Sequence, residues 1–276
     1  MSVVVVIGVG GMGEAIARRQ GTGHHLLLAD FDTGTLERVA GTLRGEGYTV
    51  TTARVDVADH ASVSALAGTA AGLGPVTQVA HTAGLSPVQA PADAVLRVDL
   101  LGVALVLEEF GRVVAPGGAG VVIASMAGAL TAGRLPAEME SVLATTPAAE
   151  LLALPHLQAD AIPDAATAYG VAKRANQVRV HAASLTWGAR GARVNSISPG
   201  VIATPMGQEE LAGASGASMR AMIDASGTGR LGTAGDIAAA AAFLLGPEST
   251  FVTGTDLLVD GGVVAAVRSG ALALPG

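Results

Sequence analysis

The sequence predicts an α/β fold in which helices cover both faces of a doubly wound parallel sheet of about seven strands. Three observations support this prediction. Short β-branched runs alternate with helical patterns along the whole chain. The first run, residues 3–7, leads directly into a glycine-rich turn and a helical pattern. Hydrophobic residues make up 50% of the chain but aromatic residues only 3%, so the core must be aliphatic, as in a parallel sheet buried on both faces.

The expected strands follow one another with a helical pattern between them. They cover residues 3–7, 26–29, 50–55, 76–80, 121–124, 193–197 and 255–259. Besides the helix after the first strand, helices are expected over residues 35–45, 61–71, 92–114, 169–187 and 234–245. Because strands joined by helical crossovers lie parallel, the whole chain, 1–276, is predicted to form a single domain.

The charge of the chain restricts its partners. A net charge of −7 without a run of Lys or Arg argues against a surface for nucleic acid or for an anionic membrane. The expected partners are therefore small molecules or copies of the same chain. The uncharged stretch 113–133 has the length of a membrane span, but proline and glycines interrupt it, so it is expected to form loop, strand and loop.

Residue types that are absent exclude further classes. The chain has no cysteine, which excludes disulfides and thiolate catalysis. His81 has no second ligand at metal-binding spacing, so it is expected in a loop and no metal site is predicted. No basic and apolar leader precedes the first strand, which favours a cytoplasmic protein.

The glycine-rich turn has the pattern of a dinucleotide-binding turn. Gly8, Gly10 and Gly13 match G-x-G-x-x-G between a strand and a helix. The first glycine permits the tight turn, the second lets the backbone approach a pyrophosphate, and the third lets the helix pack on the strand. The turn, including Gly11 and Met12, is predicted to bind phosphates at the positive end of the helix.

An acidic residue ends the next strand. Asp30 lies about 20 residues beyond the turn, where a carboxylate binds the adenosine ribose hydroxyls of a dinucleotide. It would repel a 2′-phosphate, so the pattern favours NAD over NADP. The alternative is an ordinary turn residue, a position where Asp is common.

Tyr169 and Lys173 have the spacing of a paired base. On a helix, residues four apart share one face, and an ammonium near a phenol favours the phenolate and lowers the tyrosine pKa. The chain contains a single Lys and only two Tyr, so this spacing is unlike a chance pairing. The pair is therefore interpreted as a general acid/base with its activating cation.

Together these motifs resemble the short-chain dehydrogenase/reductase family over nearly the whole chain. The resemblance implies a single-domain Rossmann fold. The residues that carry it are the glycine turn, Asp30, Asp56-Val57, Thr82-Ala83-Gly84, Ser125, Tyr169 with Lys173, Pro199-Gly200 with Thr204, Gly229-Arg230-Leu231-Gly232, Thr253-Gly254 and Asp260-Gly261-Gly262.

The resemblance also implies a reaction and a catalytic set. The protein is expected to be an NAD-dependent oxidoreductase that interconverts a secondary alcohol and a ketone. Tyr169 would be the general acid/base, and Ser125 would hydrogen-bond the substrate oxygen. Lys173 would bind the nicotinamide ribose and lower the tyrosine pKa. By the same resemblance, a homodimer or homotetramer is expected.

The remaining cofactor contacts follow from the same resemblance. Asp56 and Val57 would contact the adenine. Ile202 and Thr204 would hold the carboxamide. The cofactor-binding residues also include Thr82, Ala83, Gly84, Pro199 and Gly200.

Three motifs depart from the family pattern. Ile7 occupies the place of the first glycine of the family's turn, and His81 and Thr82 replace two asparagines that tie the central strands together. Asp99 replaces the catalytic asparagine, which holds a water in a proton relay behind the lysine. A carboxylate can pair with Lys173 but would partly offset its effect on Tyr169, so an altered pH optimum is expected.

The segment between Ser125 and Tyr169 is much longer than is usual in the family. The extra residues, about 130–165, are predicted to be an inserted helical segment with short helices at 136–144 and 147–154. Because the segment directly precedes the Tyr169 helix, which many family members use in a subunit interface, a role as a lid or in assembly is favoured. A surface insertion without a role is the alternative.

The substrate loop is expected at residues 201–227. Its methionines, Met206, Met219 and Met222, suggest an adaptable apolar pocket, and no cluster of charges indicates a phosphorylated substrate. The main alternative function is a catalytically silent NAD(H)-binding redox sensor. A sugar epimerase of the family's extended branch is less favoured because 14 residues follow Gly262, and an enoyl reductase because three residues, not six, separate Tyr169 from Lys173.

Overall fold

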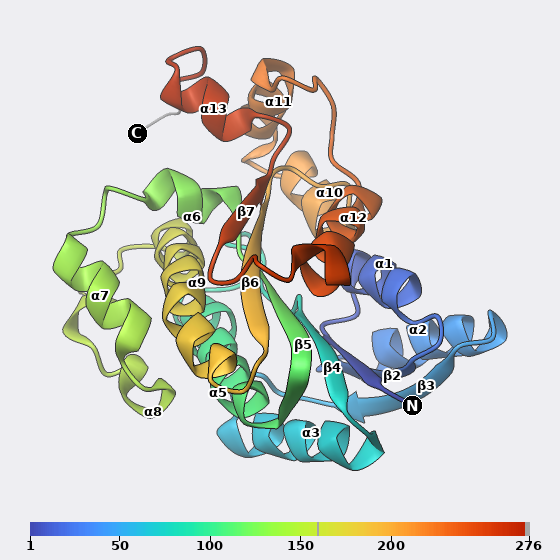
Figure 1. Ribbon diagram of the computed structural model, residues 1–276. Coiled ribbons are helices and arrows are strands. Elements are labelled where there is room, and N and C mark those ends of the chain that lie inside the picture. The colour runs from blue at the N-terminus through green and yellow to red at the C-terminus, as the bar shows by residue number, and fades with distance from the viewer. Residues whose placement is uncertain (159, 274–276) are drawn as a thin grey trace.

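The computed structural model describes residues 1–158 and 160–273; residue 159 of the predicted insertion and the last three residues of the predicted domain, 274–276, lie outside the described part. Seven parallel strands form one sheet in the order β3-β2-β1-β4-β5-β6-β7, which confirms the predicted doubly wound fold (Figure 1). The strands are β1 (Val3–Ile7), β2 (His25–Asp30), β3 (Thr49–Arg54), β4 (Val76–His81), β5 (Val114–Ile123), β6 (Arg193–Pro199) and β7 (Asp256–Val259).

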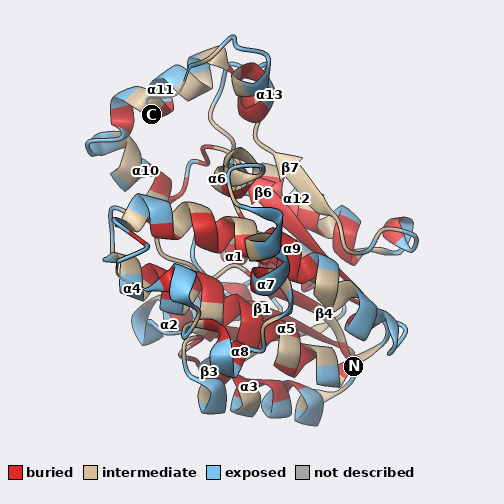
Figure 2. Cartoon of the chain, turned by 90° about the vertical axis from the view of Figure 1, so that its left-hand side faces the viewer, coloured by how far each residue is buried: buried red, intermediate tan, exposed pale blue. Residues whose placement is uncertain are grey.

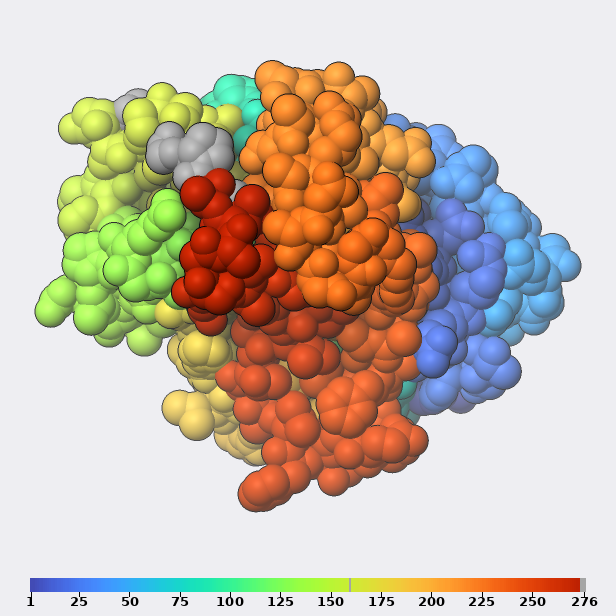
Figure 3. Space-filling model, turned by 90° about the horizontal axis from the view of Figure 1, so that it is seen from above, coloured from blue at the N-terminus to red at the C-terminus, as the bar shows by residue number. Residues whose placement is uncertain are grey.

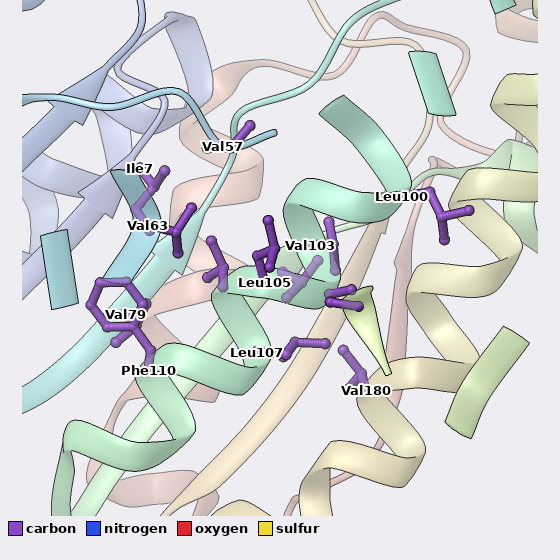
Figure 4. Packing of buried hydrophobic residues seen from close by; sticks show 14 of the residues in the cluster. Ile7, Val57, Val63, Val79, Leu100, Val103, Leu105, Leu107, Phe110 and Val180 are labelled. Atoms are coloured by element: carbon purple, nitrogen blue, oxygen red, sulfur yellow. The ribbon is translucent and has the colours of Figure 1, made fainter. Parts of the chain in front are cut away.

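Helices cover both faces of this sheet. The helices α1 (Gly11–Gln20), α2 (Thr33–Gly45) and α12 (Ala234–Leu245) lie on one face, and α3 (His60–Leu73), α5 (Gly102–Val113) and α9 (Ala165–Gly188) on the other. Side chains of β1 alternate between the two cores: Val3 and Val5 point to the second face, Val4 and Val6 to the first. Buried residues accordingly lie along the strands and on the inward faces of the helices (Figure 2). Figure 4 shows the core next to α5, where every labelled side chain except Phe110 is aliphatic.

The stretch expected as one helix over 92–114 has three parts. It consists of α4 (Ala92–Val95), a π-helical stretch (Leu96–Leu101) and α5. The π-helical part contains Asp99, and such irregular turns occur frequently at functional sites. β5 begins at Val114, earlier than the expected 121, because Val114 pairs with Val76; the pairing is then irregular at the glycines and resumes between Gln78 and Ala119.

His81 lies in the sheet, so the expected loop position is wrong. It is the last residue of β4, pairs in register with Ile7 and Val122, and is only 1% exposed. The strand is one residue longer than the pattern predicted because the backbone of β1 and β5 continues on both sides of it.

Between Ser125 and α9 the chain forms short helices on the outer face of α5 and α9. They are α6 (Met126–Thr131), α7 (Ala137–Thr145), α8 (Ala148–Leu151) and a 3₁₀ turn (Pro155–Leu157). The first of the two expected helices matches α7, whereas the second is shorter than 147–154. It ends early because Pro155 keeps Leu154 extended, with φ −59° and ψ 133°.

Two arginines of α9 anchor this segment. Arg174 binds both carboxylate oxygens of Glu140 at 2.7 Å, and Arg179 donates to the carbonyls of Leu143 and Thr146 at 2.8 and 2.9 Å. Figure 3 shows the segment, in green to yellow, on the flank of the molecule away from the blue N-terminal helices. The segment thus covers a surface of α9 with the chain's own side chains.

The remaining helices lie toward the carboxyl ends of β6 and β7 (Figure 1). They are α10 (Pro205–Ala212), α11 (Gly216–Ala225) and α13 (Val263–Arg268). A 3₁₀ turn (Pro247–Ser249) lies at the amino end of β6, where Arg193 donates a hydrogen bond to the Ser249 hydroxyl at 2.9 Å. In the part of the chain that the structure describes, no helix has the length and apolar character needed to cross a bilayer.

Candidate active site

A cleft opens at the carboxyl ends of the central strands. The chain passes from β1 outward to β2 and β3 and then returns to β4 on the other side of β1, and ligands of such sheets bind at this switch point. The cleft has a volume of about 660 Å³. The predicted cofactor residues that line it are Gly8, Gly10, Gly11, Met12, Gly13, Asp30, Asp56, Val57, Thr82, Ala83, Gly84 and Thr204.

The three fingerprint glycines meet the demands of a pyrophosphate turn. Gly8 has φ +87°, and a Cβ there would lie 2.4 Å from the Ala83 nitrogen. A Cβ on Gly13 would lie 1.9 Å from the Gly8 oxygen, so α1 can approach the turn only with glycine. A Cβ on Gly10 would meet nothing within 4 Å, because this residue borders the open cleft. The residues therefore fit a dinucleotide, and Ile7, buried in β1, does not alter the turn.

Asp30 has a structural task as well as a place in the cleft. Its carboxylate accepts hydrogen bonds from the Val9 nitrogen at 2.7 Å and the Asp32 nitrogen at 2.9 Å. The two alternatives considered for Asp30 are thus compatible, since a carboxylate has four acceptor positions. Phe31 also lines the cleft, with the Arg54 guanidinium 4.5 Å from its ring centroid. The sequence reasoning missed both, although Arg54 pairs in register with Asp30.

A second cavity adjoins the cleft and contains the predicted catalytic group. Its volume is about 240 Å³, and Ser125, Tyr169 and Lys173 line it together. Ser125 is the N-cap of α6, where its hydroxyl accepts a hydrogen bond from the Ala127 nitrogen at 3.1 Å, and its proximity lowers the pKa of the Tyr169 phenol. The Lys173 ammonium lies 5.3 Å from the centroid of the Tyr169 ring. Pro199, Gly200 and Ile202 line the same cavity, and Thr204 lines both.

Asp99 lies behind the lysine, in the interior. Its Oδ2 is 3.1 Å from Lys173 Nζ, and its Oδ1 accepts a hydrogen bond from the Leu85 nitrogen at 2.7 Å. The ammonium also donates to the Ile123 carbonyl at 3.4 Å. Asp99 is fully buried and does not line the substrate cavity. The expected partner of this carboxylate is therefore present, and it is Lys173.

Burial and this ion pair determine the titration of the site. Burial raises the pKa of Asp99, although Lys173 and the Leu85 N–H oppose the rise. Burial disfavours the charged form of Lys173, but Asp99 and Tyr169 reverse this, and the net effect raises the lysine pKa.

The pKa of Tyr169 is raised, first by burial and then by the charge of Asp99, which together outweigh the lowering by Lys173. Lys173 therefore lowers the pKa of this phenol as expected, but the net pKa in the protein alone is raised. The sequence correctly predicted that Lys173 lowers the pKa of Tyr169, but it understated how far burial raises this pKa.

His81 extends this buried polar group. Burial, together with the charge of Lys173, lowers the pKa of His81 to about 3, so its ring is neutral. Neither ring nitrogen has a hydrogen-bond partner among the described residues, and the same holds for the side-chain amide of Asn176. The described residues also contain no group of three or more His, Asp or Glu that could hold a metal ion.

The fold, the glycine-lined cleft and the neighbouring Ser, Tyr and Lys define a nucleotide-binding oxidoreductase of the Rossmann type. Two family models match consecutive parts of the chain: short chain dehydrogenase over residues 2–137, and enoyl-(acyl carrier protein) reductase over residues 137–264. The chain belongs to the short-chain dehydrogenase/reductase family, whose members use NAD or NADP.

Individual relatives agree with this assignment. A short-chain dehydrogenase/reductase of Alternaria brassicicola, bsc3, is 44% identical over 96% of this chain and 96% of its own. D-threitol dehydrogenase of Mycolicibacterium smegmatis is 31% identical over 91% of this chain and 88% of its own. The solved structure of levodione reductase matches with a TM-score of 0.76 at 25% identity, over 96% of this chain and 98% of that one.

Proposed function

We propose that this oxidoreductase uses NAD to interconvert a secondary alcohol and the corresponding ketone. The observation that carries the proposal is the convergence of Ser125, Tyr169 and Lys173 on a cavity that adjoins the glycine-lined cleft. The similarity to D-threitol dehydrogenase and levodione reductase supports alcohol and ketone substrates. The cavity's apolar walls suit a substrate with an apolar body.

Each residue of the cavity has a role in this proposal. A bound nicotinamide cofactor supplies the hydride acceptor or donor. Tyr169 takes the hydroxyl proton during oxidation, and Ser125 donates a hydrogen bond to the substrate oxygen. Lys173 stabilises the phenolate, and Asp99 holds the ammonium at 3.1 Å.

Binding of the cofactor is divided among the residues of the cleft. Asp56 and Val57 would contact the adenine, and Asp30 the adenosine ribose. Ile202 and Thr204 would hold the carboxamide, because both line the cavity beside Tyr169. Lys173 would also reach the nicotinamide ribose.

The proposal is tested by titrating the protein with NADH and then offering NAD with a panel of secondary alcohols. NADH binding and turnover of at least one alcohol are expected. Failure to bind NADH would contradict the assignment of the cleft. Tight binding without turnover across a broad panel would favour the silent redox sensor, which the changes at His81 and Asp99 leave open.

The charge of Asp30 is expected to select NAD. A carboxylate about 4 Å from a 2′-phosphate at an effective dielectric of about 20 costs several kcal/mol, so NADH should bind at least about tenfold more tightly than NADPH. In Asp30→Asn the preference should shrink, because the amide oxygen can still accept the Val9 N–H bond without the charge. Nicotinamide fluorescence measures both affinities. Equal or tighter NADPH binding by the native protein would contradict the prediction.

Asp99→Asn is expected to move the pH profile of alcohol oxidation to lower pH. The Asp99 charge raises the pKa of Tyr169, so its removal lowers that pKa and gives more phenolate at a given pH below it. The measurement is kcat/KM against pH, with Asp93→Asn, an exposed acid of α4, as the control. Profiles of Asp99→Asn and native protein that coincide would remove Asp99 from the mechanism.

The inserted segment, we infer, determines assembly and does not act as a lid. Of its described residues, 130–158 and 160–165, none lines either the cleft or the substrate cavity. It instead covers α9 through the Arg174–Glu140 pair. A homodimer or homotetramer of this protein would then use surfaces other than the covered part of α9.

Glu140→Arg tests this role, because two cations would then repel each other and release α7 from α9. The expected result is a change of molecular mass in solution, measured by light scattering, with an unchanged KM. Glu138→Arg is the matched control, since Glu138 is exposed on the same helix. Unchanged mass in Glu140→Arg, or a KM that changes without the mass, would contradict the assembly role.

A further inference from the structure

We propose that Glu210 accepts a hydrogen bond from a second hydroxyl group of the substrate, which makes the substrates largely apolar diols or hydroxyketones. The inference rests on the proposed function, because it concerns the same cavity. It adds a specificity-determining residue on α10 to the group of Ser125, Tyr169 and Lys173.

The cavity has one acidic residue in an apolar surrounding. Its lining includes aliphatic and thioether side chains from the loop after β4 and from α6, α10 and α11, namely Leu85, Val88, Met126, Met206, Met219 and Met222. Glu210 is the one carboxylate among the described residues that line this cavity. A carboxylate in such a wall is costly unless hydrogen-bond donors satisfy it.

The protein itself supplies few donors to Glu210. Its side chain is half-buried and forms no ion pair with any described residue. The buried Ser86 hydroxyl forms no close hydrogen bond but favours the charged form of Glu210, whereas burial and the neighbouring Glu209 raise the Glu210 pKa. One hydroxyl leaves most of the four acceptor positions of a carboxylate free. A donor from the substrate can use them.

The adjacent Glu209 has a different environment. It is exposed, and its Oε2 accepts a hydrogen bond from Gln89 Nε2 at 2.7 Å, so it joins α10 to the loop after β4. Glu209 does not line the substrate cavity. Two consecutive glutamates on one helix therefore differ in task, and Glu209 provides a matched control for Glu210.

Glu210 lies close enough to the reacting end for one small molecule to reach both. Its charge raises the pKa of Tyr169, and both side chains line the same 240 Å³ cavity. The reacting oxygen would lie at Ser125 and Tyr169 while a second donor reaches Glu210. A hydroxyl suits this position better than an ammonium, because the apolar wall penalises a buried cation and Lys173 would repel it.

The experiment compares cyclohexanol with the positional isomers of cyclohexanediol, which share one carbon skeleton. The kcat/KM with NAD is measured for native protein, Glu210→Leu, Glu210→Gln and Glu209→Leu. Native protein should prefer at least one diol by about 10- to 100-fold, as expected for a hydrogen bond to a charged acceptor. Glu210→Leu should lose this preference, Glu210→Gln should keep part of it, and Glu209→Leu should retain it.

Calorimetric binding of the same alcohols to the protein–NADH complex provides a reading without turnover. Tighter binding of a diol than of cyclohexanol, lost in Glu210→Leu, is expected. If diol and cyclohexanol bind equally tightly, the role of Glu210 is overturned. Tighter binding of aminocyclohexanol than of any diol would overturn it as well. If native protein turns over simple alcohols and Glu210→Leu shows the same preference between diols and cyclohexanol as native protein, this inference fails and the proposed function stands. If no alcohol is turned over, the proposed function fails, and binding still decides the role of Glu210.

Discussion

Tyr169→Phe is expected to lower kcat/KM for alcohol oxidation by about 10²- to 10⁴-fold, the contribution of a positioned general base. The phenol lines the same cavity as Ser125 and lies beside the Lys173 ammonium. Phenylalanine keeps the ring and its packing, so NADH affinity and stability should change little. The loss should therefore appear in turnover and not in cofactor binding.

Tyr48→Phe is the control for this experiment. Tyr48 is the other tyrosine of the chain, and its hydroxyl donates to the Arg18 carbonyl at 2.8 Å, on the opposite face of the sheet. Turnover by Tyr48→Phe should equal that of the native protein. A Tyr169→Phe variant that retains more than about one tenth of native kcat/KM would exclude Tyr169 as the base.

Lys173→Met is expected to abolish turnover and to destabilise the fold by about 3–5 kcal/mol, because it leaves the carboxylate of Asp99 buried without its partner. Chemical denaturation at neutral pH measures the second effect. Arg19→Met, the loss of an exposed cation on α1, should leave the free energy of unfolding nearly unchanged.

The pH dependence of the stability of Lys173→Met distinguishes the unpaired Asp99 carboxylate from a simple loss of packing. Burial raises the folded-state pKa of Asp99, and Lys173→Met removes the opposing effect of the ammonium. A carboxyl whose pKa is raised on folding stabilises the fold at low pH, and this stability is lost as the pH rises through its range. The deficit of Lys173→Met should therefore grow from acidic to neutral pH.

The double variant Lys173→Met with Asp99→Asn should recover most of the stability but none of the turnover. The amide still accepts the Leu85 N–H bond and carries no charge to bury. A double variant no more stable than Lys173→Met, or a deficit that does not depend on pH, would show that the unpaired carboxylate is not the cause.

The local patterns of the chain were sufficient to predict the fold. The run at residues 3–7 and the strands that alternate with helices gave the seven-stranded parallel sheet, because aliphatic runs of this length have few other ways to be buried. The errors came from tertiary pairing. β5 extends back to Val114 and β4 forward to His81 because neighbouring strands supply hydrogen-bond partners, which the sequence does not display.

The site residues could be predicted where their spacing in the sequence determines their relative positions in the structure. Gly8 and Gly13 could be identified because their positions need a missing Cβ, and Tyr169 and Lys173 because a helix brings them together. The net pKa of Tyr169 could not be predicted, since it depends on burial that only the packed structure defines. The sequence did not predict the places of Glu210 and Phe31 in the cavities for the same reason, because each cavity is formed by elements distant in the sequence.

The central claim, hydride exchange between a secondary alcohol and NAD, is tested most directly with an alcohol that carries deuterium on its hydroxyl-bearing carbon. The native protein is incubated with NAD and this alcohol, and the NADH formed is examined by mass spectrometry. Transfer of the deuterium to the nicotinamide ring, absent in Tyr169→Phe, is the predicted result. Bound NAD with no labelled NADH, for every alcohol that calorimetry shows to bind, would contradict the account.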